Sequence, residues 1–114
     1  MKAVRIHEYG GPEKLIFEEH VPDPVLGTDS VLVETAATSG NPIDWKIRSG
    51  ARQKDFSLTL PAILGEDVSG VVHAVGGNVR AFKLGDRVLA MAKAAYVELV
   101  GGRLLDARAI TRWL

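Results

Sequence analysis

The histidines are the first candidates for chemistry in this sequence, because imidazole binds metals and transfers protons near neutral pH. His7, His20 and His73 are scattered along the chain and lack the spacing of a metal site. The chain contains no cysteine, which excludes disulfides, thiolate zinc sites and cysteine nucleophiles. We therefore interpret the histidines as surface or sheet residues and predict no bound metal.

The glycine-rich segments are the next candidates, because glycines allow a backbone to approach phosphate groups closely. A dinucleotide-binding fingerprint has the pattern Gly-x-Gly-x-x-Gly between a strand and a helix, with an acidic residue about 20 positions later. The sequence contains no such segment. Gly76-Gly77-Asn78 lies between strand-like runs and predicts a hairpin turn. The chain therefore shows no cofactor-binding domain of its own.

A short polar segment, residues 41–50, predicts a helix with functional groups at its start. Asn41 suits the N-cap, Pro42 suits the first helical position, and Asp44 complements the helix dipole. Gly50 suits a left-handed helix stop. Asp44 and Arg48 are four residues apart, which predicts an exposed ion pair rather than a catalytic couple.

The segment that positions these residues runs from Leu60 to Ala90 and alternates β-branched residues with glycines. Each glycine inside a helix would cost about 1 kcal/mol relative to alanine, so the segment predicts consecutive strands. Gly70 predicts a bulge or a close backbone approach within them. Further strands are expected at residues 2–7, 15–19 and 30–38, and the fold class is therefore mainly β, with one or two short helices.

Composition limits the possible partners. The 114 residues match the size of one domain, and 14 basic side chains balance 14 acidic ones. No charge run offers a nucleic-acid or membrane-binding patch, and no segment has the length or apolarity of a signal core or a membrane span. We expect a cytoplasmic protein without nucleic-acid or membrane partners.

The central segment also resembles a known family. It reads Gly65-x-Asp67-x-x-Gly70-x-Val72-x-x-Val75-Gly76-x-x-Val79-x-x-Phe82-x-x-Gly85-Asp86-x-Val88. This pattern resembles the medium-chain dehydrogenase/reductase superfamily, and more narrowly its zinc-free quinone oxidoreductase branch. The resemblance covers residues 1–100 and implies a GroES-like catalytic domain, a partly open barrel of short strands. Residues 101–114 match nothing in the family, and their apolar spacing allows a short amphipathic helix.

The resemblance also implies roles for individual residues. Zinc-dependent members carry a cysteine at Asn41 and a histidine at Glu66, so this chain is expected to be zinc-independent. In members with the pattern Asn-x-x-Asp, the asparagine lies beside the nicotinamide and the substrate carbonyl. Asn41 is therefore the expected catalytic residue, with Trp45 and Glu66 as further substrate-binding residues and Asp44 as a further cofactor-binding residue. A plain helix-capping role for Asn41 is an equally good interpretation.

The implied activity is the reduction of quinones or enones by hydride transfer from NADPH. Members of the family bind NADPH chiefly through a Rossmann domain, and this chain ends where that domain would begin. We therefore expect a truncated or rearranged catalytic domain that does not bind NADPH tightly and has little or no activity alone. The alternative is a stand-alone GroES-like binding or oligomerisation module, forming a homo-oligomer through an exposed edge strand or the tail.

Overall fold

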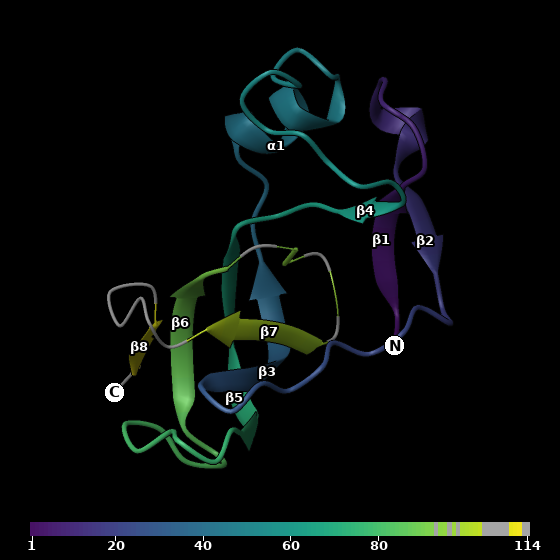
Figure 1. The fold of residues 1–114 in the computed structure, drawn as a ribbon. Coiled ribbons are helices and arrows are strands. Elements are labelled where there is room, and N and C mark those ends of the chain that lie inside the picture. The colour runs from purple at the N-terminus through teal and green to yellow at the C-terminus, as the bar shows by residue number, and fades with distance from the viewer. Residues whose placement is uncertain (93, 96, 98, 104–109, 113–114) are drawn as a thin grey trace.

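The computed structural model describes residues 1–92, 94–95, 97, 99–103 and 110–112. Its strands form two open antiparallel sheets, and the predicted mainly β fold is confirmed (Figure 1). The three-stranded sheet has the order β2-β1-β4 and the five-stranded sheet has the order β7-β3-β5-β6-β8. The strands are β1 Ala3–Ile6, β2 Ile16–Glu18, β3 Ser30–Thr38, β4 Ala62–Ile63, β5 Asp67–Val75, β6 Arg87–Met91, β7 Leu99–Arg103 and β8 Ile110–Arg112.

The five-stranded sheet holds the larger of two apolar cores. Its strands are rich in valine, whose branched side chain packs well on a pleated surface. Val31, Val72 and Val88 come from three neighbouring strands and are almost completely buried. Gly70 lies in the middle of β5, where a Cβ atom would collide with the main chain of Glu34 on β3. The predicted close backbone approach at Gly70 is therefore confirmed.

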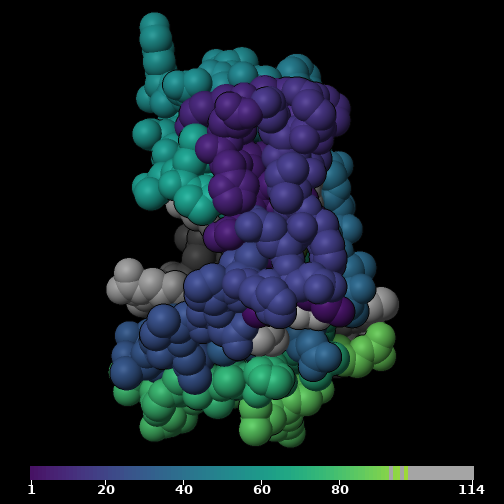
Figure 2. All heavy atoms as spheres, turned by 90° about the vertical axis from the view of Figure 1, so that its right-hand side faces the viewer, coloured from purple at the N-terminus to yellow at the C-terminus, as the bar shows by residue number. Residues whose placement is uncertain are grey.

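The three-stranded sheet and the helix α1, Pro42–Arg48, enclose the smaller core. Ile47 on the buried side of α1 joins Ile6, Ala62 and Leu64 from the sheet and its flanks. Figure 2 shows the N-terminal strands (purple) beside the region of α1 (teal), with the later strands (green) below them. A short 3₁₀ helix, Pro12–Lys14, connects β1 to β2. This packing fixes the start of α1 above one end of the five-stranded sheet (Figure 1).

Two parts of the structure differ from the sequence predictions. Residues 76–86 form a long connection with turns between β5 and β6, so no strand follows the predicted hairpin turn at Gly76-Gly77-Asn78 until β6 begins at Arg87. Residues 101–103 and 110–112, whose apolar spacing allowed a short helix, are instead extended in β7 and β8, where they pair with β3 and β6. The other residues expected in that helix, 104–109 and 113–114, lie outside the described residues. In residues 101–103 and 110–112, backbone pairing with existing strands outweighs the weak helical pattern.

No helix among the described residues has the length and apolarity needed to cross a membrane.

Candidate functional site

The candidate site lies where β3 ends and β5 begins. The two strands are antiparallel, and Thr38 pairs with Val68. The polar residues that follow Thr38 therefore come beside Asp67 at the first position of β5. Residues 26 positions apart in the sequence, Asn41 and Asp67, are brought together in this way.

A closed set of hydrogen bonds joins three side chains at this point. The amide Nδ2 of Asn41 donates to the carboxylate Oδ2 of Asp67 at 2.8 Å. The hydroxyl of Ser39 donates to the same Oδ2 at 2.9 Å, and Asn41 Nδ2 lies 3.3 Å from Ser39 Oγ. The Thr38 hydroxyl donates to the main-chain oxygen of Asp67 at 2.7 Å. We call Ser39, Asn41 and Asp67 the polar cluster.

The start of α1 holds the main chain of Asn41. The Asn41 backbone N–H donates to Oδ2 of Asp44 at 2.8 Å, as in a capping box. Asp44 is buried, with 6% of its surface exposed, so little of its carboxylate is open to a bound molecule. The expected exposed ion pair with Arg48 is wrong, because Asp44 turns inward and Arg48 donates to the Gly10 carbonyl instead. Direct contact between Asp44 and a cofactor stays a prediction.

Trp45 and Glu66, the other predicted site residues, are placed differently from the polar cluster. Trp45 projects from α1 with 50% of its surface exposed, and the ammonium of Lys46 lies 5.7 Å from its ring centroid. Glu66 is half-buried, and its carboxylate has no hydrogen-bond partner among the described residues. Each side chain is open to a ligand, and their substrate-binding roles stay predictions.

An exposed apolar strip lies beside the polar cluster. Asp67 pairs with Met91, and Ser69 pairs with Leu89. Directly opposed residues of an antiparallel pair point to the same face of a sheet, so Met91 and Leu89 share the face of Asp67. Met91 is 65% exposed and Leu89 is 45% exposed. The arrangement combines polar groups with a thioether and an isobutyl surface, which suits a flat, largely apolar molecule that carries a carbonyl oxygen.

The described residues offer no metal site, since none of their His, Asp and Glu side chains gather in groups of three or more that could hold an ion. His7 lies 3.2 Å from Glu18 on β2, and His73 lies 3.9 Å from Glu34 on β3. The two imidazoles thus each face one carboxylate on separate parts of the sheets. Zinc independence stays a prediction.

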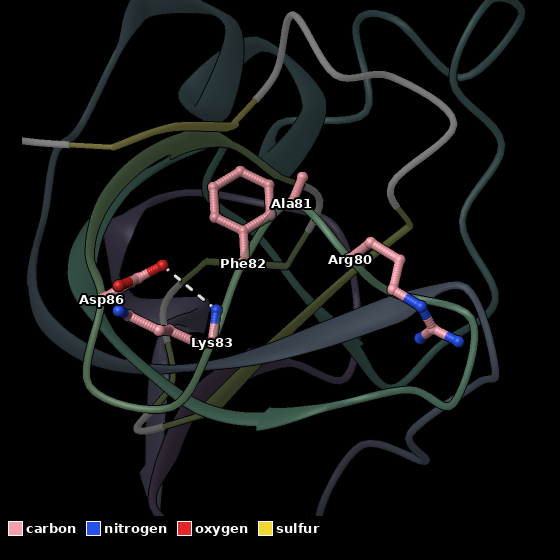
Figure 3. Close-up of a pocket in the computed structure, with 5 residues that line it drawn as sticks. All are labelled: Arg80, Ala81, Phe82, Lys83 and Asp86. Atoms are coloured by element: carbon pink, nitrogen blue, oxygen red, sulfur yellow. Dashed lines mark hydrogen bonds between the residues drawn. The ribbon is translucent and has the colours of Figure 1, made fainter.

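A pocket of about 240 Å³ lies in the connection between β5 and β6, away from the polar cluster. Figure 3 shows its lining residues, Arg80, Ala81, Phe82, Lys83 and Asp86. The backbone N–H of Lys83 donates to Asp86 Oδ2 at 3.1 Å, which stabilises the turn. The Arg80 guanidinium donates to the carbonyl of Gly77 and points away from Phe82 and Asp86 (Figure 3). The polar groups around this pocket thus serve the local loop.

Sequence reasoning singled out Asn41 but did not predict its contact with Ser39 and Asp67. The sequence marked Asp67 only as the aspartate of the Gly65-x-Asp67 pattern. The Gly-x-Asp pattern at the start of a strand marks Asp67 as special, but nothing local shows that its partner is Asn41. Only the register of β3 against β5 reveals that contact.

Comparison with known proteins gives consistent matches. Residues 27–103 match the family model of the alcohol dehydrogenase GroES-like domain. The chain is 43% identical over 88 residues to the quinone oxidoreductase of Pongo abelii, a match that covers 77% of this chain and 26% of the relative. The chain therefore spans about a quarter of the length of that curated relative.

Two solved structures show the same fold. The quinone oxidoreductase from Coxiella burnetii aligns with a TM-score of 0.87 and 30% identity, covering 100% of this chain and 37% of that one. The Escherichia coli quinone oxidoreductase, solved as a complex with NADPH, aligns with a TM-score of 0.86 and 31% identity. That alignment covers 100% of this chain and 33% of the Escherichia coli chain.

Proposed function

Because this chain belongs to the alcohol dehydrogenase GroES-like domain family and resembles quinone oxidoreductases, we propose that it is the catalytic-domain portion of an NADPH-dependent, zinc-independent quinone or enone reductase. The observation that carries the proposal is the polar cluster beside the exposed apolar strip. Together, the cluster and the strip provide a hydrogen-bond donor for a carbonyl oxygen and an apolar surface for the ring that bears this oxygen.

Asn41 is the residue that acts on the substrate oxygen. An amide N–H directed at the carbonyl stabilises the negative charge that develops there when a hydride is added to the ring or alkene. Asn41 needs little reorganisation to act as this donor. Asp67 already holds its side chain, and the start of α1 already holds its main chain. Removing one such preorganised donor from an enzyme lowers kcat by about 10²- to 10³-fold.

The residues at this site are compatible with a nicotinamide. A carboxamide presents one oxygen acceptor and one NH₂ donor. These match the Asn41 amide N–H and the Glu66 carboxylate, which has no hydrogen-bond partner within the described part of the chain. When bound, NADPH supplies the hydride, and the protein supplies binding and orientation. Trp45, half exposed on α1, offers an aromatic surface that would cover a quinone ring and exclude water from it.

Tight binding of NADPH needs more protein than these residues provide. The 114 residues contain no Gly-x-Gly-x-x-Gly segment, which is the usual means of holding a pyrophosphate at a helix N-terminus. NADPH affinity and rapid turnover therefore depend on a nucleotide-binding domain, as expected for this family. The 114 residues alone would oxidise NADPH with a quinone slowly or not at all.

A domain replacement tests the proposal. This chain would replace the matching 33% of the Escherichia coli quinone oxidoreductase, and the loss of NADPH absorbance would be followed with 1,4-benzoquinone. We expect the chimera to turn over and the free chain to show only background oxidation. The Asn41→Ala chimera should lose at least about 10²-fold in kcat, whereas Asn78→Ala, which removes an asparagine from the distant β5–β6 connection, should leave kcat unchanged.

The informative failure is a chimera that is folded and binds NADPH without reducing the quinone. That result would reject the proposed catalytic role of these residues. Equal activity of the Asn41→Ala chimera would reject Asn41 as the donor while leaving the reductase assignment in place.

A further inference from the structure

From the geometry of the polar cluster we infer that Asp67 is a positioning residue, which aims the Asn41 amide by binding one of its two hydrogens and leaving the other for a ligand oxygen. This inference rests on the proposed function for the identity of the ligand, a carbonyl or carboxamide oxygen. Its structural part concerns only the orientation of Asn41 and can be tested without a cofactor.

The carboxylate determines which way the amide faces. An ionised carboxylate only accepts hydrogen bonds, so the Asn41 orientation that places Nδ2 at 2.8 Å from Asp67 is favourable. The flipped orientation would set the amide oxygen against the carboxylate oxygen. Charge-assisted hydrogen bonds are about twice as strong as neutral ones, so this contact selects one of two otherwise similar side-chain orientations.

Asp67 is itself held in place by the last residue of β3 and the residue that follows it. The Ser39 hydroxyl donates to the same carboxylate oxygen that Asn41 uses, and the Thr38 hydroxyl donates to the Asp67 main-chain oxygen. These bonds fix the acceptor from both its side chain and its backbone. The position of the Asn41 amide is thus set by residues on β5 and after β3, as well as by its own helix.

The second Asn41 hydrogen is the one available to a ligand. It faces Ser39 Oγ at 3.3 Å, just beyond the usual range of distances for N–H···O hydrogen bonds. Ser39 is exposed, so this contact is open to replacement. A carbonyl oxygen that approaches from the exposed side would accept this hydrogen in place of Ser39, while the hydrogen bound to Asp67 stays where it is.

Two substitutions separate these roles. Asp67→Asn keeps the size of the side chain and removes its charge. Ser39→Ala removes the competing acceptor and one hydrogen bond to Asp67, but leaves the Asp67 carboxylate and its bond to Asn41 in place. The matched control is Asp29→Asn, because Asp29 accepts from Nδ2 of Asn78 at 3.1 Å in an equivalent but exposed pair. All three proteins would be labelled with ¹⁵N, and their backbone amide spectra would verify that each is folded.

The side-chain NH₂ signals of Asn41 in the free chain are the first measurement. In the parent chain we expect two well-separated proton signals, the downfield one bound to Asp67. Asp67→Asn should shift that signal upfield and bring the two together. Ser39→Ala should move mainly the other signal and leave the two well separated, and Asp29→Asn should move only the signals of Asn78. Unchanged Asn41 signals in a folded Asp67→Asn chain would overturn the inference.

Kinetics of the Escherichia coli chimera are the second measurement. With 1,4-benzoquinone, Asp67→Asn should lower kcat by about tenfold with KM changed less, since it misdirects a donor needed in the transition state. The matched control Asp29→Asn, which lies outside the polar cluster, should keep kcat within about twofold of the parent. Equal losses for the two variants would reject a specific role for Asp67. An inactive parent chimera would reject the proposed function instead, and the NMR result would still decide whether Asp67 orients Asn41.

Discussion

Replacing Gly70 with alanine should destabilise the five-stranded sheet strongly. A Cβ atom at Gly70 would lie 2.8 Å from Cγ1 of Val33 and 3.0 Å from the main-chain carbon of Glu34, and closer still to the Glu34 carbonyl oxygen. Both neighbours belong to β3, which lies between β5 and β7. The clash therefore involves a backbone that is fixed on both sides, and a flexible side chain cannot relieve it.

The size of the effect follows from two opposing contributions. Overpacking a well-packed core costs about 1 to 3 kcal/mol, and the upper end applies here because the obstacle is main chain. Replacing glycine also stabilises by about 0.4 to 1 kcal/mol through the unfolded state. Gly77→Ala is a matched control, because a Cβ there meets no atom within 4 Å. Both variants gain the same contribution through the unfolded state. The expected difference in their free energies of unfolding, about 3 kcal/mol, is therefore the cost of the clash alone.

Thermal and urea unfolding of the purified chain measure this difference. For a chain of this length, about 3 kcal/mol corresponds to a midpoint roughly 12 °C lower for Gly70→Ala than for Gly77→Ala. Circular dichroism at both temperature extremes verifies that the same folded and unfolded states are compared. Equal midpoints for the two variants would refute the reasoning that the approach of β3 to β5 requires glycine at this position.

Three further predictions concern the helix start, an ion pair and the core. Asp44→Ala should lower the free energy of unfolding by about 1 to 2 kcal/mol in urea titrations, because the Asn41 N–H loses its acceptor; an unchanged value would show that water replaces the carboxylate fully. A hydrogen bond from Arg5 lowers the pKa of Glu18 from 4.5 to about 2, so the unfolded chain binds more protons in this range and stability falls as pH drops through it. Glu18→Gln should flatten the stability curve between these pH values, and a curve parallel to that of the parent would contradict the pairing. Val88→Ala, at a side chain with 0% exposure, should cost about 2 kcal/mol in the same titrations, and a loss below about 0.5 kcal/mol would show that the core collapses around the gap.

Local signals in the sequence predicted most of the elements that position the site. The strand over residues 30–38 and the helix that starts after Asn41 are confirmed at the predicted places. Both depend on short-range chemistry, since β-branched residues favour strands and the Asn-Pro pair favours a helix start. The left-handed stop at Gly50 is also confirmed, with a φ of +83°.

The errors arose where a local rule competed with a more distant partner. Asp44 and Arg48 have the spacing of an exposed ion pair. In the structure, however, Asp44 accepts a hydrogen bond from the Asn41 N–H, and Arg48 donates one to the Gly10 carbonyl. Backbone groups that would otherwise lack these partners, the Asn41 N–H at the helix start and the Gly10 carbonyl, gain more from these side chains than a solvated ion pair would contribute. The contact between Asn41 and Asp67 was also beyond local rules, because it depends on how two strands pair.

The pairing of β3 with β5 therefore determines whether the polar cluster exists at all. Successive side chains in a strand point to opposite faces, so a slip of one residue would turn Asp67 away from Asn41. The register shifts between Thr35 and Ala37, directly beside the pairing of Thr35 with Gly70, where the absence of a Cβ lets the strands approach. If this irregularity sets the register, folded Gly70→Ala protein should show altered side-chain NH₂ signals for Asn41, and Gly77→Ala should not. Parent-like Asn41 signals in folded Gly70→Ala protein would mean that β3 absorbs the clash locally and that the site is positioned independently of Gly70.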